Sequence, residues 1–185
     1  MRIRQTGGSI YRLKVTLRGS RPPIWRRFLV PADITLKRLH DSLQAVMGWT
    51  DSHLHQFTAK GVVYGTTDHE FGMVRVSETR TTVAQILRRP KDRLMYEYDF
   101  GDSWEHDVVL EAVLPPGSGR YPVVEGGRRA CPPEDVGGIS GYALFLEAIA
   151  DPKHPEHAEM LEWIGGCFDP ESFDSGETNP DIRGG

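Results

Sequence analysis

The chain has 185 residues, of which 38% are hydrophobic and 26% are charged, and its formal net charge at pH 7 is −4. These values are ordinary for a globular protein, and a chain of this length can form one domain with its own core. No apolar run approaches the roughly 20 residues that cross a bilayer, and the first residues lack the apolar region of a secretion signal, so we expect a cytoplasmic protein without a membrane partner.

The first 30 residues predict a basic β-hairpin. Residues 10–17 alternate between apolar and polar side chains, residues 19–23 have turn composition, and residues 24–30 provide the return strand. Residues 1–50 carry ten Lys or Arg against two acids, or +8, whereas the remaining 135 carry twelve against twenty-four, or −12. Two interpretations stay open: the two parts neutralise each other, or the hairpin contacts nucleic acid. In the second case the contact residues are Arg12, Lys14, Arg26 and Arg27.

A helix and further strands follow the hairpin. Apolar residues recur at helical spacing across 36–47, where Thr35 or Asp33 can cap the start and Gly48 can end the helix. Two short strands come next, at residues 53–58 and 62–64. Hairpin, helix and further strands is the order of a β-grasp domain, so we expect a β-grasp-like N-terminal part.

The middle of the chain predicts a loop at residues 66–74 and then a short helix, opened by the capping-box spacing of Thr82 and Gln85. The strongest strand signals follow, at residues 94–100 and 104–114. Residues 115–138, rich in glycine and proline, predict a long loop.

Two helices close the domain, one over residues 141–150 and one between Pro155 and Gly165. The second has a solid acidic face, which argues against a DNA-recognition helix. We therefore expect an α+β fold: one compact domain over residues 1–174, with a mixed or antiparallel sheet and a C-terminal helix pair. The tail at residues 175–185 has almost nothing to bury and is expected to be disordered.

The segment from Tyr96 to His106 is the sharpest candidate site. If Gly101-Asp102 is a two-residue hairpin turn, then Glu97, Asp99, Trp104 and His106 project from one face. Carboxylates beside an imidazole can hold a divalent metal or support acid–base chemistry. The alternative is structural: Asp99 and Asp102 fix the turn through side-chain hydrogen bonds.

A second candidate is the loop that contains Cys131, Glu134 and Asp135. These residues could supply metal ligands or a thiolate, since two preceding arginines would lower the pKa of the thiol if they lay close. The alternative is a buried cysteine in a loop braced by prolines. A third candidate is His53 with His55, which share a strand face and supply half of a metal site that Asp99 or His106 would complete. The alternative is that both histidines are ordinary residues on the polar face of the strand.

Known catalytic signatures are missing from the sequence. It has no GxxxxGK[ST] phosphate loop, no HExxH metal motif and no dinucleotide fingerprint after a strand. Residues 138–142 lack the final glycine of a nucleophile elbow, and two cysteines without a CxxC pair make neither a disulfide framework nor a zinc ribbon.

Several segments together resemble the plasmid Ri ORF-three-like family of bacteria and archaea, also known as passenger proteins of insertion elements. The most specific are YDFGDSWEH at 98–106, CPPEDVGG at 131–138 and GGCFDPE at 165–171. Shorter ones are IYRLKV at 10–15, PIWRR at 23–27, Leu39-His40 with MGW at 47–49, and HLHQF at 53–57. The resemblance covers roughly residues 9–174 and implies a compact α+β domain without an established activity. The family's motif positions fall on Asp99, Asp102, His106, Cys131, Glu134 and Asp135, and no catalytic role comes with them.

Two functions remain open from the sequence. The first is a non-catalytic binding or accessory module, which would use the basic N-terminal half or an acidic groove to contact a protein or nucleic acid. The second is a metal-dependent hydrolase or nuclease that uses the Asp/His hairpin and the Cys131–Asp135 loop. No cofactor is predicted apart from a divalent metal in the second case.

Overall fold

The computed structural model describes residues 8–66, 75–117 and 119–175. Nearly all of the loop expected at 66–74 and of the tail expected at 175–185 lies outside these ranges. Within them the chain forms one eight-stranded sheet, in the order β5-β4-β3-β6-β7-β1-β2-β8. The strands are β1 (Ile10–Leu17), β2 (Trp25–Pro31), β3 (His55–Ala59), β4 (Val62–Gly65), β5 (Val76–Ser77), β6 (Arg93–Tyr98), β7 (Trp104–Leu114) and β8 (Val123–Arg128).

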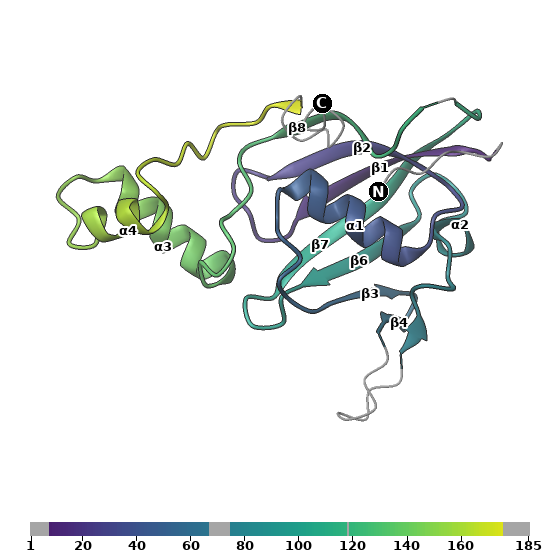
Figure 1. Cartoon of the computed structure of the whole chain (residues 1–185), viewed down its shortest axis with the longest axis horizontal. Coiled ribbons are helices and arrows are strands. Elements are labelled where there is room, and N and C mark those ends of the chain that lie inside the picture. Colours follow the sequence, from purple (N-terminus) through teal and green to yellow (C-terminus); the bar gives the residue numbers. More distant parts are fainter. Residues whose placement is uncertain (1–7, 67–74, 118, 176–185) are drawn as a thin grey trace.

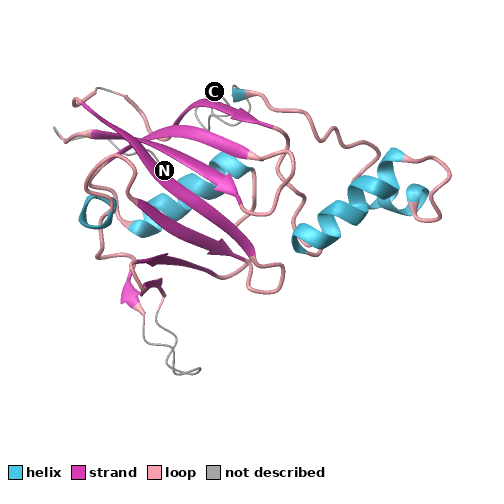
Figure 2. Cartoon of the chain, turned by 180° about the vertical axis from the view of Figure 1, so that it is seen from behind, coloured by secondary structure: helices cyan, strands magenta, loops and turns pink. Residues whose placement is uncertain are grey.

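The sheet is mixed: β4 and β5 are parallel, and the other neighbours are antiparallel. The helices are α1 (Leu36–Met47), α2 (Val83–Ile86), α3 (Gly138–Ala150) and α4 (His157–Trp163). Figure 1 shows α1 lying across one face of the sheet, with α3 and α4 side by side beyond its end. Figure 2 shows the opposite face, across which no described helix lies. The expected single α+β domain with a C-terminal helix pair is confirmed.

Helix α1 forms where the sequence predicts it. The Thr35 side chain accepts a hydrogen bond from the backbone N–H of Arg38, and Gly48 ends the helix with a left-handed backbone at φ 85°. Four side chains on its apolar face are fully buried, and each contributes roughly 1.5–3 kcal/mol through burial. They are Leu36, Leu39, Leu43 and Val46. This face holds α1 against the sheet and so fixes where the helix ends.

The hairpin of β1 and β2 and the order hairpin, helix, strands are also as predicted. The likeness to a β-grasp domain beyond that order stays a prediction. Both strands next to β1, which are β2 and β7, run antiparallel to β1. Alternation along β1 places Leu13 and Val15 in the core and Arg12 and Lys14 on the opposite face.

The predicted register of the β6–β7 hairpin is wrong by one residue. Tyr98 pairs with Trp104, so the connecting loop comprises residues 99–103 rather than a two-residue turn. The left-handed backbone that closes this loop occurs at Asp99 (φ 56°) and Ser103 (φ 53°) rather than at a glycine. The sequence-based prediction failed because it assigned the left-handed position to Gly101.

The shifted register redistributes the hairpin side chains between the two faces of the sheet. Trp104 and His106 are fully buried, with Tyr96 paired to His106 on the core side. Glu97 pairs with Glu105 on the opposite face. The expected shared face of Glu97, Asp99, Trp104 and His106 therefore does not exist.

Strand β8 lies within residues 115–138, where a loop was predicted. It pairs antiparallel with β2 at the edge of the sheet. Its Gly127 allows close approach of the C-terminal segment, because a Cβ there would lie 2.6 Å from the ring of Phe173. The capping box of α2 and the second C-terminal helix are confirmed, and α3 begins three residues earlier than predicted, at Gly138.

Candidate functional site

Three loops that are remote in sequence meet at the C-terminal end of α1. They are the segment 48–54, the hairpin loop 99–103 and the loop 131–137. The indole N–H of Trp49 donates to the carbonyl of Pro132 over 3.0 Å. The carboxylate of Glu134 accepts from the hydroxyls of Thr50 and Tyr98, each over 2.6 Å. These bonds fasten the 131–137 loop to the helix end and to β6.

His53, Asp99 and Asp135 come together at this junction, and we call them the His53 trio. The Nε2 atom of His53 lies 3.1 Å from Oδ1 of Asp135 and 3.7 Å from Oδ2 of Asp99. One donor atom from each residue lies within 4.8 Å of the other two. Nε2 of His53 is buried and makes no hydrogen bond to any described residue. The three side chains therefore face one another at ion-pair distances, and no hydrogen bond joins His53 Nε2 to either carboxylate.

Asp99 has one carboxylate oxygen for the turn and one for the trio. Oδ1 accepts from the backbone N–H of Gly101 over 2.9 Å, whereas Oδ2 faces His53. The backbone N–H of Asp99 donates to the carbonyl of Leu54 over 2.8 Å, which ties the two chain segments together. The structural interpretation of Asp99 as a turn residue and its proximity to His53 are thus compatible.

The separations within the His53 trio resemble those of metal ligands. Two donor atoms bound about 2.0–2.2 Å from one ion, at tetrahedral or octahedral angles, are about 2.8–3.6 Å apart. The His53–Asp135 separation of 3.1 Å falls in this interval, and the His53–Asp99 separation of 3.7 Å is slightly longer. One imidazole with two carboxylates suits a divalent first-row ion such as Mn²⁺, Fe²⁺ or Zn²⁺.

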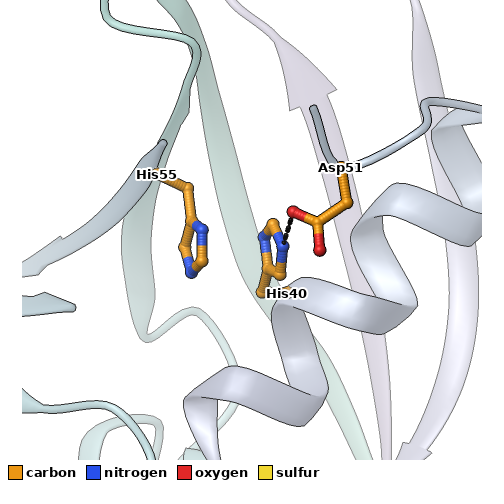
Figure 3. Close-up of side chains that lie close together, drawn as sticks. All are labelled: His40, Asp51 and His55. Carbon is orange, nitrogen blue, oxygen red and sulfur yellow. Dashed lines mark hydrogen bonds and ion pairs between the residues drawn. The ribbon is translucent and has the colours of Figure 1, made fainter. Parts of the chain in front are cut away.

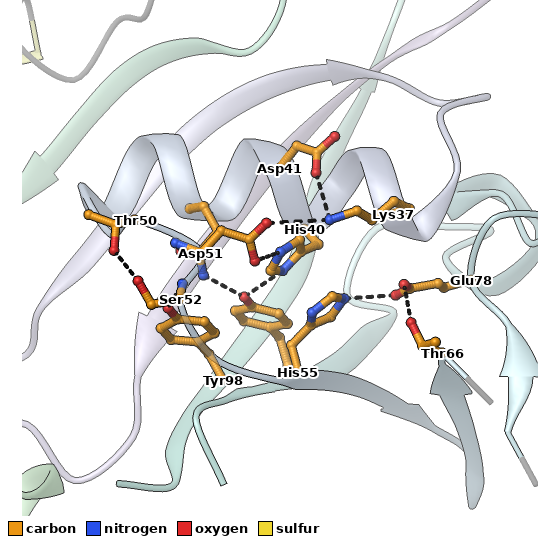
Figure 4. A network of polar contacts seen from close by, with 12 residues as sticks. Lys37, His40, Asp41, Thr50, Asp51, Ser52, His55, Thr66, Glu78 and Tyr98 are labelled. Carbon is orange, nitrogen blue, oxygen red and sulfur yellow. Dashed lines mark hydrogen bonds and ion pairs between the residues drawn. The ribbon is translucent and has the colours of Figure 1, made fainter. Parts of the chain in front are cut away.

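A second cluster lies deeper, between α1 and β3. The rings of His40 and His55 stack with centroids 3.5 Å apart, and Nε2 of His40 bonds to Oδ1 of Asp51 over 2.7 Å (Figure 3). On the other side, Nε2 of His55 bonds to Oε2 of Glu78 over 2.8 Å (Figure 4). The stacked imidazoles are thus held between two carboxylates, and Lys37 approaches Asp51 from the helix surface at 3.6 Å.

Burial and hydrogen bonding shift the pKa values of this cluster. His40 is fully buried, which lowers its pKa to about 4 despite the nearby Asp51. Burial alone would raise the pKa of Glu78, but the hydrogen bond and charge of His55 outweigh it and hold that pKa below its usual value. His40 is therefore neutral and Glu78 ionised at neutral pH.

The deeper cluster does not have the geometry of a metal site, although donor atoms of His40, Asp51 and His55 also lie within 4.8 Å of one another. The 2.7 Å contact between His40 and Asp51 is a hydrogen bond, shorter than ligands of one ion lie from each other. Parallel rings stacked face to face also direct their nitrogens alongside each other rather than toward one point. The expected metal set of His53, His55, Asp99 and His106 is therefore divided among three places.

The remaining predicted site residues make contacts that hold the fold together. Asp102 accepts from the backbone N–H of Gly137 over 3.1 Å and so joins the hairpin loop to the start of α3. Glu97 lies on the opposite face, where it accepts from Gln56 over 2.7 Å. His106 is buried against Trp49, and burial lowers its pKa to about 4. Neither Glu97 nor His106 meets the His53 trio.

Cys131 is a partly buried thiol rather than a thiolate. Burial raises its pKa to about 11, although the nearby Arg26 acts in the opposite direction. Nη2 of Arg26 donates to its sulfur over 3.0 Å. The two arginines that precede Cys131 are not its partners: Arg129 instead pairs with Glu171 at 2.8 Å. The alternative of a packed, unreactive cysteine therefore fits the geometry.

The basic N-terminal residues are engaged within the sheet. Arg12 pairs with Glu125 and Arg27 with Glu111, each at 2.6 Å. Lys14 lies over the ring of Trp25. Arg26 is 2% exposed, so its guanidinium cannot reach a phosphate. This arrangement favours the interpretation that the basic and acidic parts of the chain neutralise each other.

Sequence reasoning missed His40, Asp51 and Glu78. The one local signal was His40, a polar residue on the apolar face of an amphipathic helix, which needs a buried partner. Nothing local identifies Glu78, whose partner His55 is far away in sequence. Asp135 was proposed in the Cys131 loop but not with His53, because their proximity depends on how the loops pack.

Comparisons with known proteins cover nearly the whole of the described domain. A family model described as plasmid pRiA4b ORF-3-like protein matches residues 9–177. The chain belongs to this family. The uncharacterized protein y4hQ of Sinorhizobium fredii is 42% identical over 172 residues, which cover 92% of this chain and 87% of the relative. The crystal structure of MM3350, a protein of unknown function from Methanosarcina mazei Go1, matches with a TM-score of 0.84 and 38% identity, over 93% of this chain and 97% of that chain.

Membership of the pRiA4b ORF-3-like family confirms the resemblance and agrees with the α+β fold, but neither relative has an assigned activity. Segments behind the resemblance supply Trp49, His53, Asp99 and Asp135 at the junction described above, and His40 in the deeper cluster. No described helix is long and apolar enough to cross a membrane.

Proposed function

We propose that this protein is a non-catalytic binding module that holds a divalent first-row metal ion between His53, Asp99 and Asp135. The observation that carries the proposal is the arrangement of three donor atoms with separations close to those of ligands on one ion. Two carboxylates beside one imidazole also concentrate negative charge, which favours a cation over a neutral ligand.

The surroundings support a held ion rather than a loose surface pair. Asp99 keeps Oδ2 directed at His53 because its other oxygen and its backbone N–H are both bonded. The neighbour of Asp135, Glu134, is anchored by Thr50 and Tyr98. Bonds of this kind, made by groups that do not touch the ion, orient metal ligands in proteins. Before an ion binds, Asp99 is therefore held in place, and Asp135 is next to a residue that is held in place.

Titration calorimetry with MnCl₂ and with ZnCl₂ tests the proposal on the full chain. We expect one ion per chain, and we expect His53→Gln and Asp135→Asn each to weaken binding by at least about 100-fold, because loss of a direct ligand exceeds the 10–100-fold effect of outer groups. Asp33→Asn, which changes an exposed carboxylate at the other end of α1, is the matched control and retains binding. Binding that ignores both trio variants, or no binding by the wild type, contradicts the proposal.

A metal-dependent hydrolase is the second candidate. The observation that favours it is the 71% exposed side chain of Asp135, which leaves one side of the trio open to water and substrate. A metal ion lowers the pKa of bound water and so generates a nucleophile at neutral pH. Turnover of bis(p-nitrophenyl) phosphate by metal-loaded wild type, abolished in Asp135→Asn, supports this candidate. If wild type and Asp135→Asn both hydrolyse this substrate only at the background rate, the hydrolase candidate is wrong and the binding module remains.

A further inference from the structure

A closed ring of hydrogen bonds lies directly behind the segment that carries His53. Nε2 of His40 bonds to Oδ1 of Asp51 over 2.7 Å, and Nδ1 of His40 bonds to the Tyr96 hydroxyl over 2.9 Å. Nε2 of Gln44 donates to the same hydroxyl over 2.9 Å, and Oε1 of Gln44 accepts from the backbone N–H of Asp51 over 3.0 Å. The hydrogen-bond ring therefore begins and ends at Asp51.

One assignment of donors and acceptors satisfies every hydrogen bond in this ring. The ionised Asp51 carboxylate only accepts, so Nε2 of His40 carries the proton that it donates. Nδ1 of the neutral imidazole then accepts, and the Tyr96 O–H donates to it. The phenolic oxygen accepts from Gln44, whose carbonyl oxygen remains for the backbone N–H of Asp51. Each polar group in the ring has a matching partner, as buried polar groups require.

The ring acts on a backbone conformation that is unfavourable for an ordinary residue. Asp51 has a left-handed backbone with φ 59°, which costs an L-residue roughly 1–2 kcal/mol. The ring holds Asp51 there through both its carboxylate and its N–H. The next residue is fixed as well, since the N–H of Ser52 donates to the Tyr98 hydroxyl over 3.0 Å. His53 follows immediately.

We propose that His40, Gln44 and Tyr96 are positioning residues, whose hydrogen-bond ring through Asp51 sets the backbone of residues 51–53 and so aims His53 at Asp99 and Asp135. The effect on metal affinity rests on the proposed function, whereas the ring and its effect on the backbone do not. None of the three touches the proposed ion.

The first test requires no metal. Nitrogen NMR of uniformly ¹⁵N-labelled protein at pH 7 assigns the protonated nitrogen of His40. We expect a neutral ring protonated at Nε2, and we expect Tyr96→Phe to shift the amide signals of residues 51–53. Tyr142→Phe is the matched control, because the Tyr142 hydroxyl is buried but has no hydrogen-bond partner among the described residues. A charged His40, a ring protonated at Nδ1, or unchanged amide signals in Tyr96→Phe overturns the ring.

The second test measures Mn²⁺ and Zn²⁺ affinity. We expect Tyr96→Phe and Asp51→Ala to weaken binding about tenfold while every ligand stays in place, as removal of an orienting partner does at metal sites. Asp51→Asn keeps an oxygen that accepts from His40 and tolerates the left-handed backbone, so it retains near-wild-type affinity. Urea unfolding of each variant separates loss of positioning from loss of the fold.

The two proposals fail in different ways. If the wild type binds no metal, the proposed function fails and the NMR test still decides the ring. If the wild type binds metal and Tyr96→Phe binds it with nearly the same affinity, the positioning role is wrong and the His53 trio stands.

Discussion

The imidazole rings of His40 and His55 lie parallel, with planes 7° apart and centroids separated by 3.5 Å. Each ring bonds through Nε2 to a different carboxylate, His40 to Asp51 and His55 to Glu78. The stack therefore joins α1 to β3 and to the segment before α2 across the core. It also directs the Nε2 atom of each histidine to its own carboxylate rather than to a shared point.

Acid destabilisation is the first prediction, and it concerns His106. Its folded-state pKa is lowered to about 4 by burial, whereas an unfolded histidine titrates near its ordinary 6.5. As the pH falls from 6.5 to 4, the unfolded chain takes up a proton that the folded chain excludes, so stability is lost in this window. The loss amounts to about 2–3 kcal/mol by pH 4.5. Urea unfolding at pH 7.0 and 4.5 measures it, and in His106→Leu the loss is smaller by that amount. An equal loss in both proteins refutes the assignment.

Thiol reactivity is the second prediction. Cys167 is exposed, whereas burial raises the pKa of Cys131 to about 11. Because the thiolate is the reactive form, we expect Cys131 to react with a disulfide reagent at pH 8 at least about 100-fold more slowly than Cys167. Stopped-flow absorbance then shows one fast thiol in the native protein and two after unfolding in urea. Cys167→Ser removes the fast phase, and a fast phase that survives in this variant contradicts the prediction.

Glycine at the start of α3 gives the third prediction. A Cβ at Gly138 would lie 2.4 Å from the backbone oxygen of Asp102, and its φ is 67°. Gly165 has a similar φ of 87°, but a Cβ there would meet nothing within 4 Å, so Gly165→Ala isolates the cost of the backbone conformation. We expect Gly138→Ala to lose about 2 kcal/mol more than Gly165→Ala in chemical unfolding. If both variants lose the same free energy of unfolding, the contact between Gly138 and the Asp102 carbonyl does not constrain the start of α3.

The fourth prediction distinguishes structural from surface basic residues. Arg26 donates to the carbonyls of Val46 and Arg128, over 3.2 and 3.0 Å, from a buried position. Arg26→Met leaves these carbonyls without their donor, and we expect a loss of about 2–4 kcal/mol in the free energy of unfolding. Lys14→Met, on the uncovered face, changes stability by less than about 0.5 kcal/mol. If hairpin charges bind DNA, only Lys14→Met weakens salt-sensitive binding to a duplex.

Local signals were sufficient for most elements. Alternation predicted β1, and the apolar spacing ending at Gly48 predicted α1, whose N-terminal cap is Thr35, one of the two candidates Asp33 and Thr35. These elements follow from patterns within a few residues. The β6–β7 register failed because Asp99 and Ser103 adopt left-handed backbones that composition does not reveal. β8 was missed because its Gly127 serves close packing against Phe173 of the C-terminal segment, which composition does not reveal.

The candidate site was only partly predictable because its contacts are nonlocal. His53 and Asp99 were proposed together as ligands, and the hydrolase hypothesis combined the Asp99 hairpin with the Asp135 loop. Asp135 was not proposed with His53, because their proximity depends on how the loops pack. His106 was placed beside carboxylates by a register that the loop length changes. Side-chain identity suggested the chemistry, and tertiary packing decided which side chains share a place.

β1 lies inside the sheet, between β7 and β2, and this position has a consequence for how the chain folds as it is synthesised. Ile10 pairs with Pro31 in β2 and with Leu114 in β7, so one neighbour is made soon after β1 and the other much later. Pairing between distant segments carries a loop-closure cost and slows folding. The edge of β1 that pairs with β7 therefore stays unpaired while the middle of the chain is synthesised. We expect the sheet to close in one late step once β6 and β7 have emerged.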